Sequence, residues 1–512
     1  MQRPFSHFNK NFGKNTVRDE TGSMTIFAMF IFVIILIVGG MAVDIMRYEN
    51  KRVHLQNTAD RAVLAAGSLR QPNDPEEVVR EYFRREGLEE YLTNVRIEEG
   101  LNFRRVNVST SDTSPTMFMK FLGVNELTMT PVSASEERYS KVEVSLVLDI
   151  SGSMVQNNST RLANLRSAGQ DFIDTLYENS EPGQVSVSII PYAAQVNLGP
   201  VFSQYFNISP RLTQSQCVNF AVGSFNTTQL RPTDSLTATG HFDPWQLGQI
   251  SSITCPTQSG AELVAFSGDP DFLRNRINSL HAVGGTSIEI GVKWGAALLD
   301  PAMRPVITEM IADGHISSEF SGRPLAYEDE DALKVLVIMT DGDNFEERQM
   351  RTAYISGISP IHRHKNEDRY SIYVPSRNEY YVPHLSSNRR WQSDPYGGFN
   401  GSNQLTWDQL WELKTVRWVV SNLYHSSTHP APTFVDSIQP WQKNERMEAI
   451  CNAVNARDIP IFTVAFEAGD LGRAAMQLCA TSLSHYFDVD GTDIRGAFRA
   501  IAGTINRLRL TQ

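Results

Sequence analysis

Residues 146–154 read LVLDISGSM, and this stretch decides the fold of most of the chain. Its first half is almost wholly apolar, which is typical of a strand that is buried on both faces of a parallel sheet. The strand pattern ends at Asp149, and Ser151 and Ser153 follow at alternate positions. A carboxylate and two hydroxyls at the end of a buried strand predict a site for a hard cation, or else a turn in which Asp149 and Ser151 cap a helix.

The sequence from residue 140 onward alternates apolar strand patterns with helical patterns. Strands are predicted at 142–148, 185–191, 333–339, 459–466 and 485–489, and helices at 161–177, 287–299, 444–455, 471–481 and 493–508. Apolar strands that alternate with helices indicate an α/β fold, with a doubly wound, mostly parallel sheet covered on both faces. Two long segments, 199–262 and 345–440, interrupt this alternation and are expected to be insertions.

A second acidic residue, Asp341, follows the apolar strand predicted at 333–339. Ligands of doubly wound sheets bind at the carboxyl ends of the strands, so we expect Asp341 to lie beside Asp149. Between them in sequence, Gly284-Gly285-Thr286-Ser287 predicts a tight loop that opens a helix. Oxygen ligands with few carboxylates and several hydroxyls suit Mg²⁺ or Mn²⁺. The candidate metal residues are therefore Asp149, Ser151, Ser153, Thr286 and Asp341.

This set resembles the metal-ion-dependent adhesion site of von Willebrand factor type A domains, with Asp149-x-Ser151-x-Ser153, then Thr286, then Asp341 in a Thr-Asp-Gly. The resemblance covers roughly residues 140–508, with the two insertions outside it. It implies a Rossmann-like domain in which Ser151, Ser153 and Thr286 coordinate the metal directly. It also implies that Asp149 and Asp341 act through water, and that an acidic group of a partner completes the metal's ligands.

Residues 24–43 contain no charged residue. At about 1.5 Å per residue this run spans roughly 30 Å, the thickness of a bilayer core. It passes without a break into a helical pattern that reaches residue 68, which favours a retained anchor over a cleaved secretory signal with its shorter apolar core. Basic residues precede and follow the run, so the positive-inside rule favours a cytoplasmic N-terminus only weakly.

The N-terminal segment resembles a second family. Gly22-Ser23, the apolar run, GMAVD ending at Asp44, and LQNTADRAVLAA ending at Ala66 look like the N-terminus of TadG-type proteins. These proteins are associated with tight-adherence (Flp) pilus assembly in bacteria, and the resemblance covers about residues 20–70. Phe27 stands where related prepilin-like proteins have a glutamate, which argues against cleavage by a prepilin peptidase. A generic signal anchor is the alternative.

The sequence thus predicts four segments. They are a cytoplasmic tail at 1–21, a transmembrane and membrane-proximal helix at 22–70, a small α+β module at 72–138, and a type A domain at 140–508 with insertions at 199–262 and 345–440. Within the module, Asp74-Pro75 predicts a helix start, and alternating patterns predict strands at 103–108 and 127–132.

The four cysteines are Cys217, Cys255, Cys451 and Cys479. An even number without a CxxC motif favours disulfide bonds in an oxidising compartment over a zinc ribbon. Spacing alone does not fix the pairing, and four buried thiols in a cytosolic protein remain the alternative.

Several function classes are disfavoured. A net charge of −11 without a run of Lys and Arg argues against nucleic acid as a partner. The chain has no P-loop, GxSxG or HExxH motif, so we do not expect an enzyme, and a metal-dependent hydrolase is the least favoured alternative. His362 and His364 are interpreted as part of a polar surface loop and not as a second metal site.

We therefore predict a protein of the bacterial inner membrane that crosses it once, with the C-terminal bulk in the periplasm or outside the cell. Its predicted partners are pilus or secretion-system proteins, bound through the metal. The alternative is a surface adhesin that binds host glycan or matrix through the metal site and the Trp-rich second insertion. Trp407, Trp411 and Trp418 could form such a face, but their spacing of four and seven residues favours the buried stripe of one helix.

Overall fold

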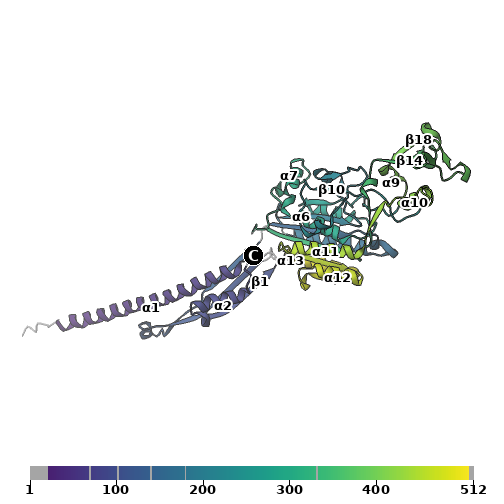
Figure 1. The fold of residues 1–512 in the computed structure, drawn as a ribbon. Helices are drawn as coiled ribbons and strands as arrows, with labels where there is room; N and C mark the ends of the chain where they lie inside the picture. Colours follow the sequence, from purple (N-terminus) through teal and green to yellow (C-terminus); the bar gives the residue numbers. More distant parts are fainter. Residues whose placement is uncertain are drawn as a thin grey trace, which may run out of the picture. The chain divides into compact units, whose positions relative to one another are not determined.

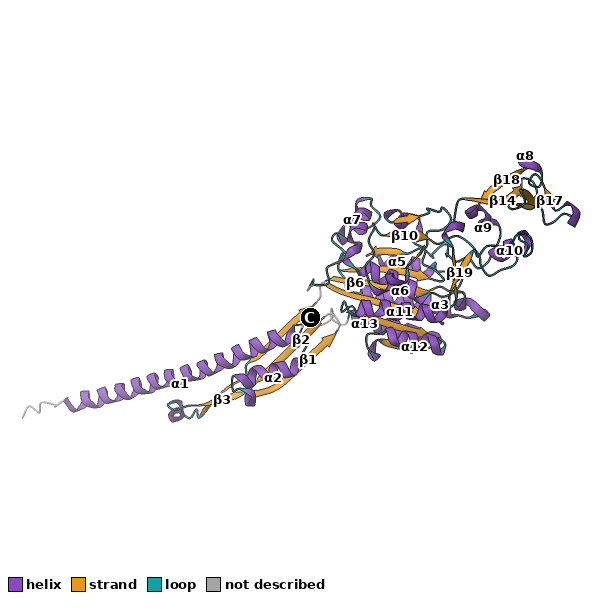
Figure 2. Cartoon of the chain, in the orientation of Figure 1, coloured by secondary structure: helices purple, strands orange, loops and turns teal. Residues whose placement is uncertain are grey.

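The computed structural model describes residues 21–68, 71–100, 103–138, 141–178, 180–329 and 332–506 (Figures 1 and 2). The predicted tail at 1–21 lies outside them except for its last residue, as do residues 507–508 of the last predicted helix. The chain divides into two compact units: Met1–Glu99 with Phe103–Glu137, and Gly100–Asn102 with Arg138–Gln512.

A single helix, α1 (Thr21–Gly67), dominates the first unit (Figure 1). Its most apolar window is only 6% buried, and it is the one helix in the described residues that is long and apolar enough to cross a membrane. Its second half is packed, because Leu55, Ala59 and Ala62 lie on one face at helical spacing and are fully buried. Val53 lies outside this face and is 45% exposed.

The predicted α+β elements complete the first unit. The helix α2 (Pro75–Arg85) starts where predicted, with the Asp74 carboxylate accepting a hydrogen bond from the Glu77 amide at 2.9 Å. Three strands pair in the order β1-β2-β5, and two others form a separate hairpin. They are β1 (Leu92–Gly100), β2 (Phe103–Thr110) and β5 (Val132–Arg138), and the hairpin strands β3 (Asp112–Pro115) and β4 (Glu126–Met129). The strand predicted at 127–132 is therefore two strands, which Pro131 separates.

Strand β5 is also hydrogen-bonded to α1. The Gln56 side chain donates to the Val132 carbonyl at 3.3 Å, and the Ser133 hydroxyl donates to Asp60 at 2.6 Å. The Ser135 hydroxyl donates to the Val63 carbonyl at 2.5 Å. Residue numbers rise together on both sides of this contact, so the helix and the strand run side by side in the same direction.

The second unit is built on a six-stranded sheet of order β11-β7-β6-β12-β20-β21. Its strands are β6 (Lys141–Asp149), β7 (Val185–Tyr192), β11 (Val264–Ser267), β12 (Ala332–Thr340), β20 (Ile461–Phe466) and β21 (Tyr486–Val489). Only β11 is antiparallel to its neighbour. Numbered along the chain, the order is 3-2-1-4-5-6, which is that of a doubly wound fold. The predicted doubly wound, mostly parallel sheet is confirmed.

Helices cover both faces of this sheet (Figure 1). One face packs against α3 (Arg161–Tyr177), α5 (Pro270–Asn278) and α13 (Ile494–Asn506). The other packs against α6 (Ile288–Leu299), α7 (Arg304–Ala312), α11 (Pro440–Asn455) and α12 (Asp470–Cys479). Every residue of α6 is buried, so this helix is the centre of its layer.

The first insertion forms small elements around a disulfide bond between Cys217 and Cys255. These are α4 (Gly199–Phe202) and the strands β8 (Asn207–Ser209), β9 (Val218–Asn219) and β10 (Ser235–Ala238). The other two cysteines, Cys451 and Cys479, form a second disulfide that ties α11 to α12. The structure therefore contains the disulfide bonds that the cysteine count suggested, and it gives their pairing.

The second insertion has a core of its own. Strands β13 (Glu347–Met350) and β19 (Val435–Ile438) pair where it leaves the main unit. Beyond them lies a sheet of order β17-β16-β15-β14-β18, with the short helices α8, α9 and α10. The bounds are β14 (Ile358–His364), β15 (Tyr370–Val374), β16 (Glu379–Tyr381), β17 (Trp391–Gln392), α8 (Gly398–Gly401), β18 (Ser402–Thr406), α9 (Trp407–Leu413) and α10 (Val416–Leu423).

Two predictions about this insertion need correction. Trp407 and Trp411 are buried as expected, but Trp418 lies half-buried on a second helix. The first helix ends before Lys414, and Thr415 caps α10 by accepting a hydrogen bond from the Trp418 amide. His362 is not in a surface loop: it is a buried residue of β14, and its ring packs edge-on against Tyr380.

Gly291 and Gly295 of α6 let this helix lie directly on the sheet. A Cβ atom on Gly295 would stand 2.7 Å from a Val147 methyl group and 2.8 Å from a Leu336 methyl group. We therefore expect Gly295→Ala to destabilise the second unit by about 1–3 kcal/mol through overpacking, even though alanine favours helix by about 1 kcal/mol. Urea unfolding of the purified chain, followed by tryptophan fluorescence, measures this effect.

The matched control is Gly503→Ala in α13, where nothing lies within 4 Å of the added Cβ atom. This variant should be as stable as the wild type or slightly more stable. If both variants unfolded at the same urea concentration as the wild type, the close approach of α6 to the sheet would be wrong.

Candidate metal centre

The pairing of β6 with β12 brings the two predicted aspartates together. Met339 pairs with Leu148 in the parallel register, so Asp149 at the end of β6 lies opposite Thr340. Asp341 is the next residue, and both carboxylates are buried. This edge is the point at which the strand order reverses, where doubly wound folds bind their ligands.

Hydrogen bonds order the Asp149 loop. One Asp149 oxygen accepts from the Ser151 amide at 2.7 Å, and the other accepts from the Thr340 hydroxyl at 2.7 Å. The Ser151 and Ser153 hydroxyl oxygens lie 2.9 Å apart. The Ser153 hydroxyl donates to Asp341 at 2.6 Å. Ser151, Ser153 and Asp341 therefore form one connected set of oxygen atoms, and Asp149 joins it through the Ser151 amide.

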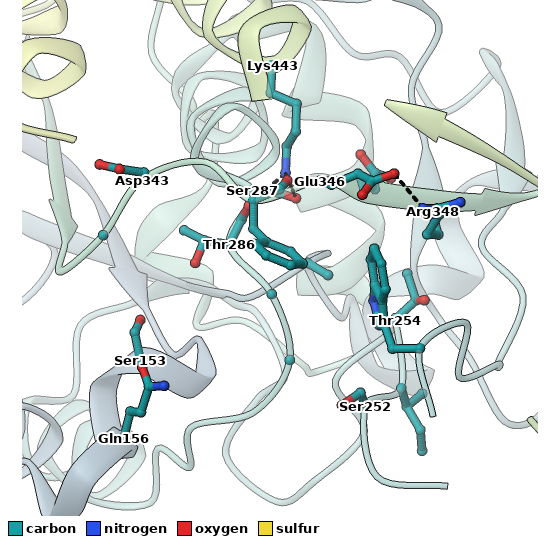
Figure 3. A pocket seen from close by; sticks show the side chains of 18 of the residues that line it. Ser153, Gln156, Ser252, Thr254, Thr286, Ser287, Asp343, Glu346, Arg348 and Lys443 are labelled. Atoms are coloured by element: carbon teal, nitrogen blue, oxygen red, sulfur yellow. Dashed lines mark hydrogen bonds and ion pairs between the residues drawn. The ribbon is translucent and has the colours of Figure 1, made fainter. Parts of the chain in front are cut away.

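The fifth residue, Thr286, lies in the loop that faces this set. The Gly152 amide donates to the Gly284 carbonyl at 2.9 Å, which joins the two loops. Gly284 has φ +79°, a left-handed conformation that glycine adopts without strain. Thr286 and Ser153 line the same cavity, of about 480 Å³ (Figure 3). The hydrogen bonds that the structure shows for Thr286 are made by its backbone carbonyl, with the Phe345 amide and the Lys443 ammonium.

The electrostatics of the set favour a positive charge. Burial and the neighbouring Asp341 raise the pKa of Asp149 to about 7. Burial also raises the pKa of Asp341, although Ser153 and Arg161 oppose the shift. The Arg161 guanidinium lies 3.1 Å from Asp341, and its other side contacts Glu467 at 2.7 Å. A cation next to these carboxylates would lower the cost of keeping them ionised.

The donor set suits a hard divalent cation. It consists of hydroxyl and carboxylate oxygens, the ligands that Mg²⁺ and Mn²⁺ prefer. The part of the chain that the structure describes contains no group of three or more His, Cys, Asp or Glu side chains placed to hold a metal. The candidate centre is not such a group, because three of its five residues contribute hydroxyls.

Several residues of the centre were not predicted. Thr340 and Arg161 contact the two aspartates directly, and the Tyr192 hydroxyl lies 3.4 Å from Asp149. Thr340 could have been found, because it precedes Asp341 in the same motif. Arg161 and Lys443 gave no signal, because a charged residue near the start of a helix usually faces water.

Lys443 fixes the Thr286 loop from behind. Its buried ammonium donates to the Thr286 carbonyl at 2.6 Å, to the Ser287 hydroxyl at 2.6 Å and to the Phe345 carbonyl at 2.8 Å. It also lies 3.8 Å from Glu289, a fully buried residue of α6. In Figure 3 Lys443 reaches down from α11 to this loop.

Asp343 takes no part in the set of oxygen atoms. Its side chain is exposed, and its carboxylate accepts a hydrogen bond from the Gly472 amide at 2.5 Å in the first turn of α12. A negative charge is favourable at a helix N-terminus, because it interacts with the positive end of the helix dipole.

Three comparisons with known proteins bear on the chain. Residues 22–69 match a family model described as putative Flp pilus-assembly TadE/G-like, which confirms the resemblance of the N-terminal segment. No curated protein matches the sequence.

Solved structures with a similar fold include the vWF domain of the type V pili tip protein Mfa5 from Porphyromonas gingivalis. It is 16% identical, with 73% of this chain and 98% of that chain covered and a TM-score of 0.32. The adhesive tip pilin GBS104 from Group B Streptococcus agalactiae is 13% identical, with 71% and 100% covered and a TM-score of 0.30. The mussel byssus protein PTMP1 with a zinc-occupied MIDAS motif is 9% identical, with 71% and 46% covered and a TM-score of 0.27. The assignment of the fold rests on the strand order, because TM-scores this low carry no argument.

Glu289 gives a prediction about pH. Burial raises its pKa from 4.5 to about 7, with Lys443 opposing and Glu347 adding to the shift. The folded state therefore binds more protons than the unfolded state between these values, and stability should fall as pH rises from about 5 to about 8. Glu289→Gln should remove up to about 3 kcal/mol of this fall. Urea midpoints at both pH values, with chelator present, measure it.

Asp149 contributes in the same direction, so the variant should keep a shallower slope and not a flat one. The control is Glu445→Gln, an exposed position on α11 that should retain the wild-type slope. Identical slopes for all three chains would mean that Lys443 keeps Glu289 ionised throughout.

Proposed function

We propose that this chain is a single-pass component of the bacterial envelope that binds a protein partner through a metal ion, in Flp pilus assembly or in secretion. One observation carries the proposal: Ser151, Ser153 and Asp341 form one hydrogen-bonded set of oxygen atoms beside a cavity that Thr286 also lines. A turn that only capped a helix would need neither the second aspartate nor the cavity.

The metal would be held by the hydroxyls of Ser151, Ser153 and Thr286, with Asp149 and Asp341 acting through water. Such an ion supplies a strong positive charge with a ligand position that a partner can fill. The chain's own residues prepare the position. Asp149 fixes the Ser151 loop, and Arg161 balances the charge of Asp341.

In this proposal the partner inserts a carboxylate into the cavity. Its wall beyond the hydroxyls carries the exposed Phe345 and the half-buried Trp245, whose rings lie 5.5 Å apart. The Arg348 guanidinium lies over the Trp245 ring at 4.9 Å. A partner's Asp or Glu could enter between this wall and the hydroxyls, which is a binding role and needs no catalytic residue.

The N-terminal segment supports the location. The match to the TadE/G-like model covers the apolar part of α1, and that part is almost wholly exposed in the structure. We propose an inner-membrane anchor with the C-terminal bulk in the periplasm or outside the cell, which agrees with two disulfides. In this proposal residues 22–70 are the anchor helix, 72–138 the module built on it, and 140–508 the type A domain.

The surface-adhesin alternative loses its main support. Trp407 and Trp411 stack on each other at 5.6 Å and pack against Phe434 inside the second insertion. Aromatic side chains in such a core hold the insertion together and are not available to a glycan.

The metal site can be tested with matched serine variants. Ser153→Ala removes the hydroxyl that joins Ser151 to Asp341, so Mg²⁺ affinity should fall by roughly tenfold or more. Ser252 lines the same cavity away from the hydroxyls, so the Ser252→Ala variant should bind Mg²⁺ as the wild type does. Isothermal titration calorimetry of the full chain in detergent, with Mg²⁺ and with Mn²⁺, measures both.

The partner is tested in cells with the same pair of variants. Crosslinking followed by purification should recover pilus or secretion-system proteins with the wild type and with Ser252→Ala, and lose them with Ser153→Ala or with chelator. Recovery that is unchanged in Ser153→Ala would sink the metal-ligation mechanism.

A further inference from the structure

The hairpin of β3 and β4 ends in a short apolar segment, residues 117–124, with the sequence MFMKFLGV. Its only charged residue is Lys120. The tip contains one turn of 3₁₀ helix, Met119–Leu122, and Gly123 closes it in a left-handed conformation with φ +89°. We call residues 117–124 the apolar tip.

Most of the apolar side chains of the tip are exposed. Phe121 is 74% exposed and Leu122 is 57% exposed, and Met117, Phe118 and Val124 are exposed as well. Scattered apolar residues are normal on a protein surface, but five within eight residues form a contiguous patch. Such a patch indicates a surface that contacts a protein partner or a membrane.

The position of the tip along α1 is fixed by a series of contacts. At the base of the hairpin, Lys51 pairs with Asp112 at 2.6 Å. Nearer the tip, the buried Asp44 carboxylate accepts three hydrogen bonds, from the amides of Met117, Phe118 and Met119 at 2.9, 2.7 and 2.8 Å. The hairpin therefore runs along α1 toward its N-terminal half (Figure 2).

Asp44 is the first charged residue after the apolar run at 24–43. One turn earlier, Gly40 lies directly under Phe118, since a Cβ atom on Gly40 would stand 2.2 Å from the Phe118 ring. The tip thus overlaps the last turn of the apolar run, a depth of roughly 5 Å along the helix. This is the depth at which apolar side chains of interfacial segments enter a bilayer, about 5–10 Å.

We propose that the apolar tip is a second membrane contact, in which Phe121, Leu122 and their neighbours insert into the bilayer surface beside the end of α1. The proposal rests on the membrane anchoring by α1 proposed above. The occupant is lipid and not a protein, because the patch is continuous with the lipid-facing surface of the anchor. Lys120 fits this position, since its long side chain can reach the headgroups while its stem stays in the apolar layer.

Asp44 makes this arrangement possible. A carboxylate at the membrane boundary is costly unless it is paired or hydrogen-bonded. Here three backbone N–H groups donate hydrogen bonds to the Asp44 carboxylate. The carboxylate in turn supplies these N–H groups with an acceptor, which lipid does not offer. The same interaction therefore holds the tip at one height and lets it enter the bilayer.

Fluorescence quenching in vesicles tests the proposal with the full chain. All four native cysteines are in disulfides, so a single introduced cysteine can carry an environment-sensitive dye. Three chains are compared in vesicles of phosphatidylethanolamine and phosphatidylglycerol: Leu122→Cys at the tip, Arg85→Cys on α2, and Phe32→Cys in the apolar run. The quenchers are lipids that carry a spin label either near the headgroup or deep in the acyl chain.

The dye at residue 122 should lose most of its fluorescence to the shallow quencher. The dye at residue 85 should lose none, because Arg85 is 75% exposed and its neighbour Glu86 contacts α1 at His54, roughly 15 Å beyond Asp44. The dye at residue 32 should be quenched by the deep label. Adding Phe121→Glu to the Leu122→Cys chain should restore fluorescence, because a carboxylate opposes insertion.

The outcomes separate the two proposals. Quenching at residue 32 without quenching at residue 122 overturns the membrane contact and leaves the anchor intact. No quenching at residue 32 overturns the anchor itself. A further sample mixes the dye-labelled Leu122→Cys chain with copies that carry a spin label at residue 122. Quenching in this sample, without quenching by spin-labelled lipid, would show that a second chain covers the tip and would also overturn the proposal.

Discussion

The parallel pairing of β6 with β12 is the constraint on which the second unit depends. At the start of the two strands, Glu143 and Lys334 are paired in register and joined by an ion pair of 2.5 Å. At their other end, Asp149 and Asp341 are two like charges side by side. A shift of register by one residue would separate the first pair and turn every side chain of one strand to the opposite face of the sheet. The ion pair of Glu143 and Lys334 thus helps to fix the register that places the two aspartates together. The surrounding hydroxyls and Arg161 compensate for the repulsion between the aspartates.

Much of this could be read from the sequence, because strands buried on both faces carry a continuous apolar signal. The strands that end at Asp149 and at Thr340 were located to within one or two residues for this reason. Asp341 was placed beside Asp149 by the rule that ligands bind where the strand order reverses. The edge strand β11 was missed, since its four residues follow a long insertion and carry little pattern.

The supporting charges of the centre were harder to predict. Lys443 lies one residue before the helix predicted at 444–455, where a lysine is normally solvated. Its burial follows from the segment that leads to the second insertion, whose backbone carbonyl at Phe345 it binds. Trp407 and Trp418 show a similar limit: their spacing fits one helix, but the Thr415 cap starts a new one between them. Long-range packing decides both cases, and sequence periodicity reports only local structure.

The side-by-side contact of α1 with β5 has a mechanical consequence. If α1 anchors the chain in a membrane as proposed, tension on the protein would enter through α1 and leave toward the second unit through β5. Because both segments run in the same direction, this tension acts along their shared contact as shear. The bonds of Gln56, Ser133 and Ser135, together with the apolar face of α1, must then break at nearly the same time and not in succession. Forced unfolding is governed by the rate of crossing that single barrier, so the module is built to resist pulling more than its small core suggests.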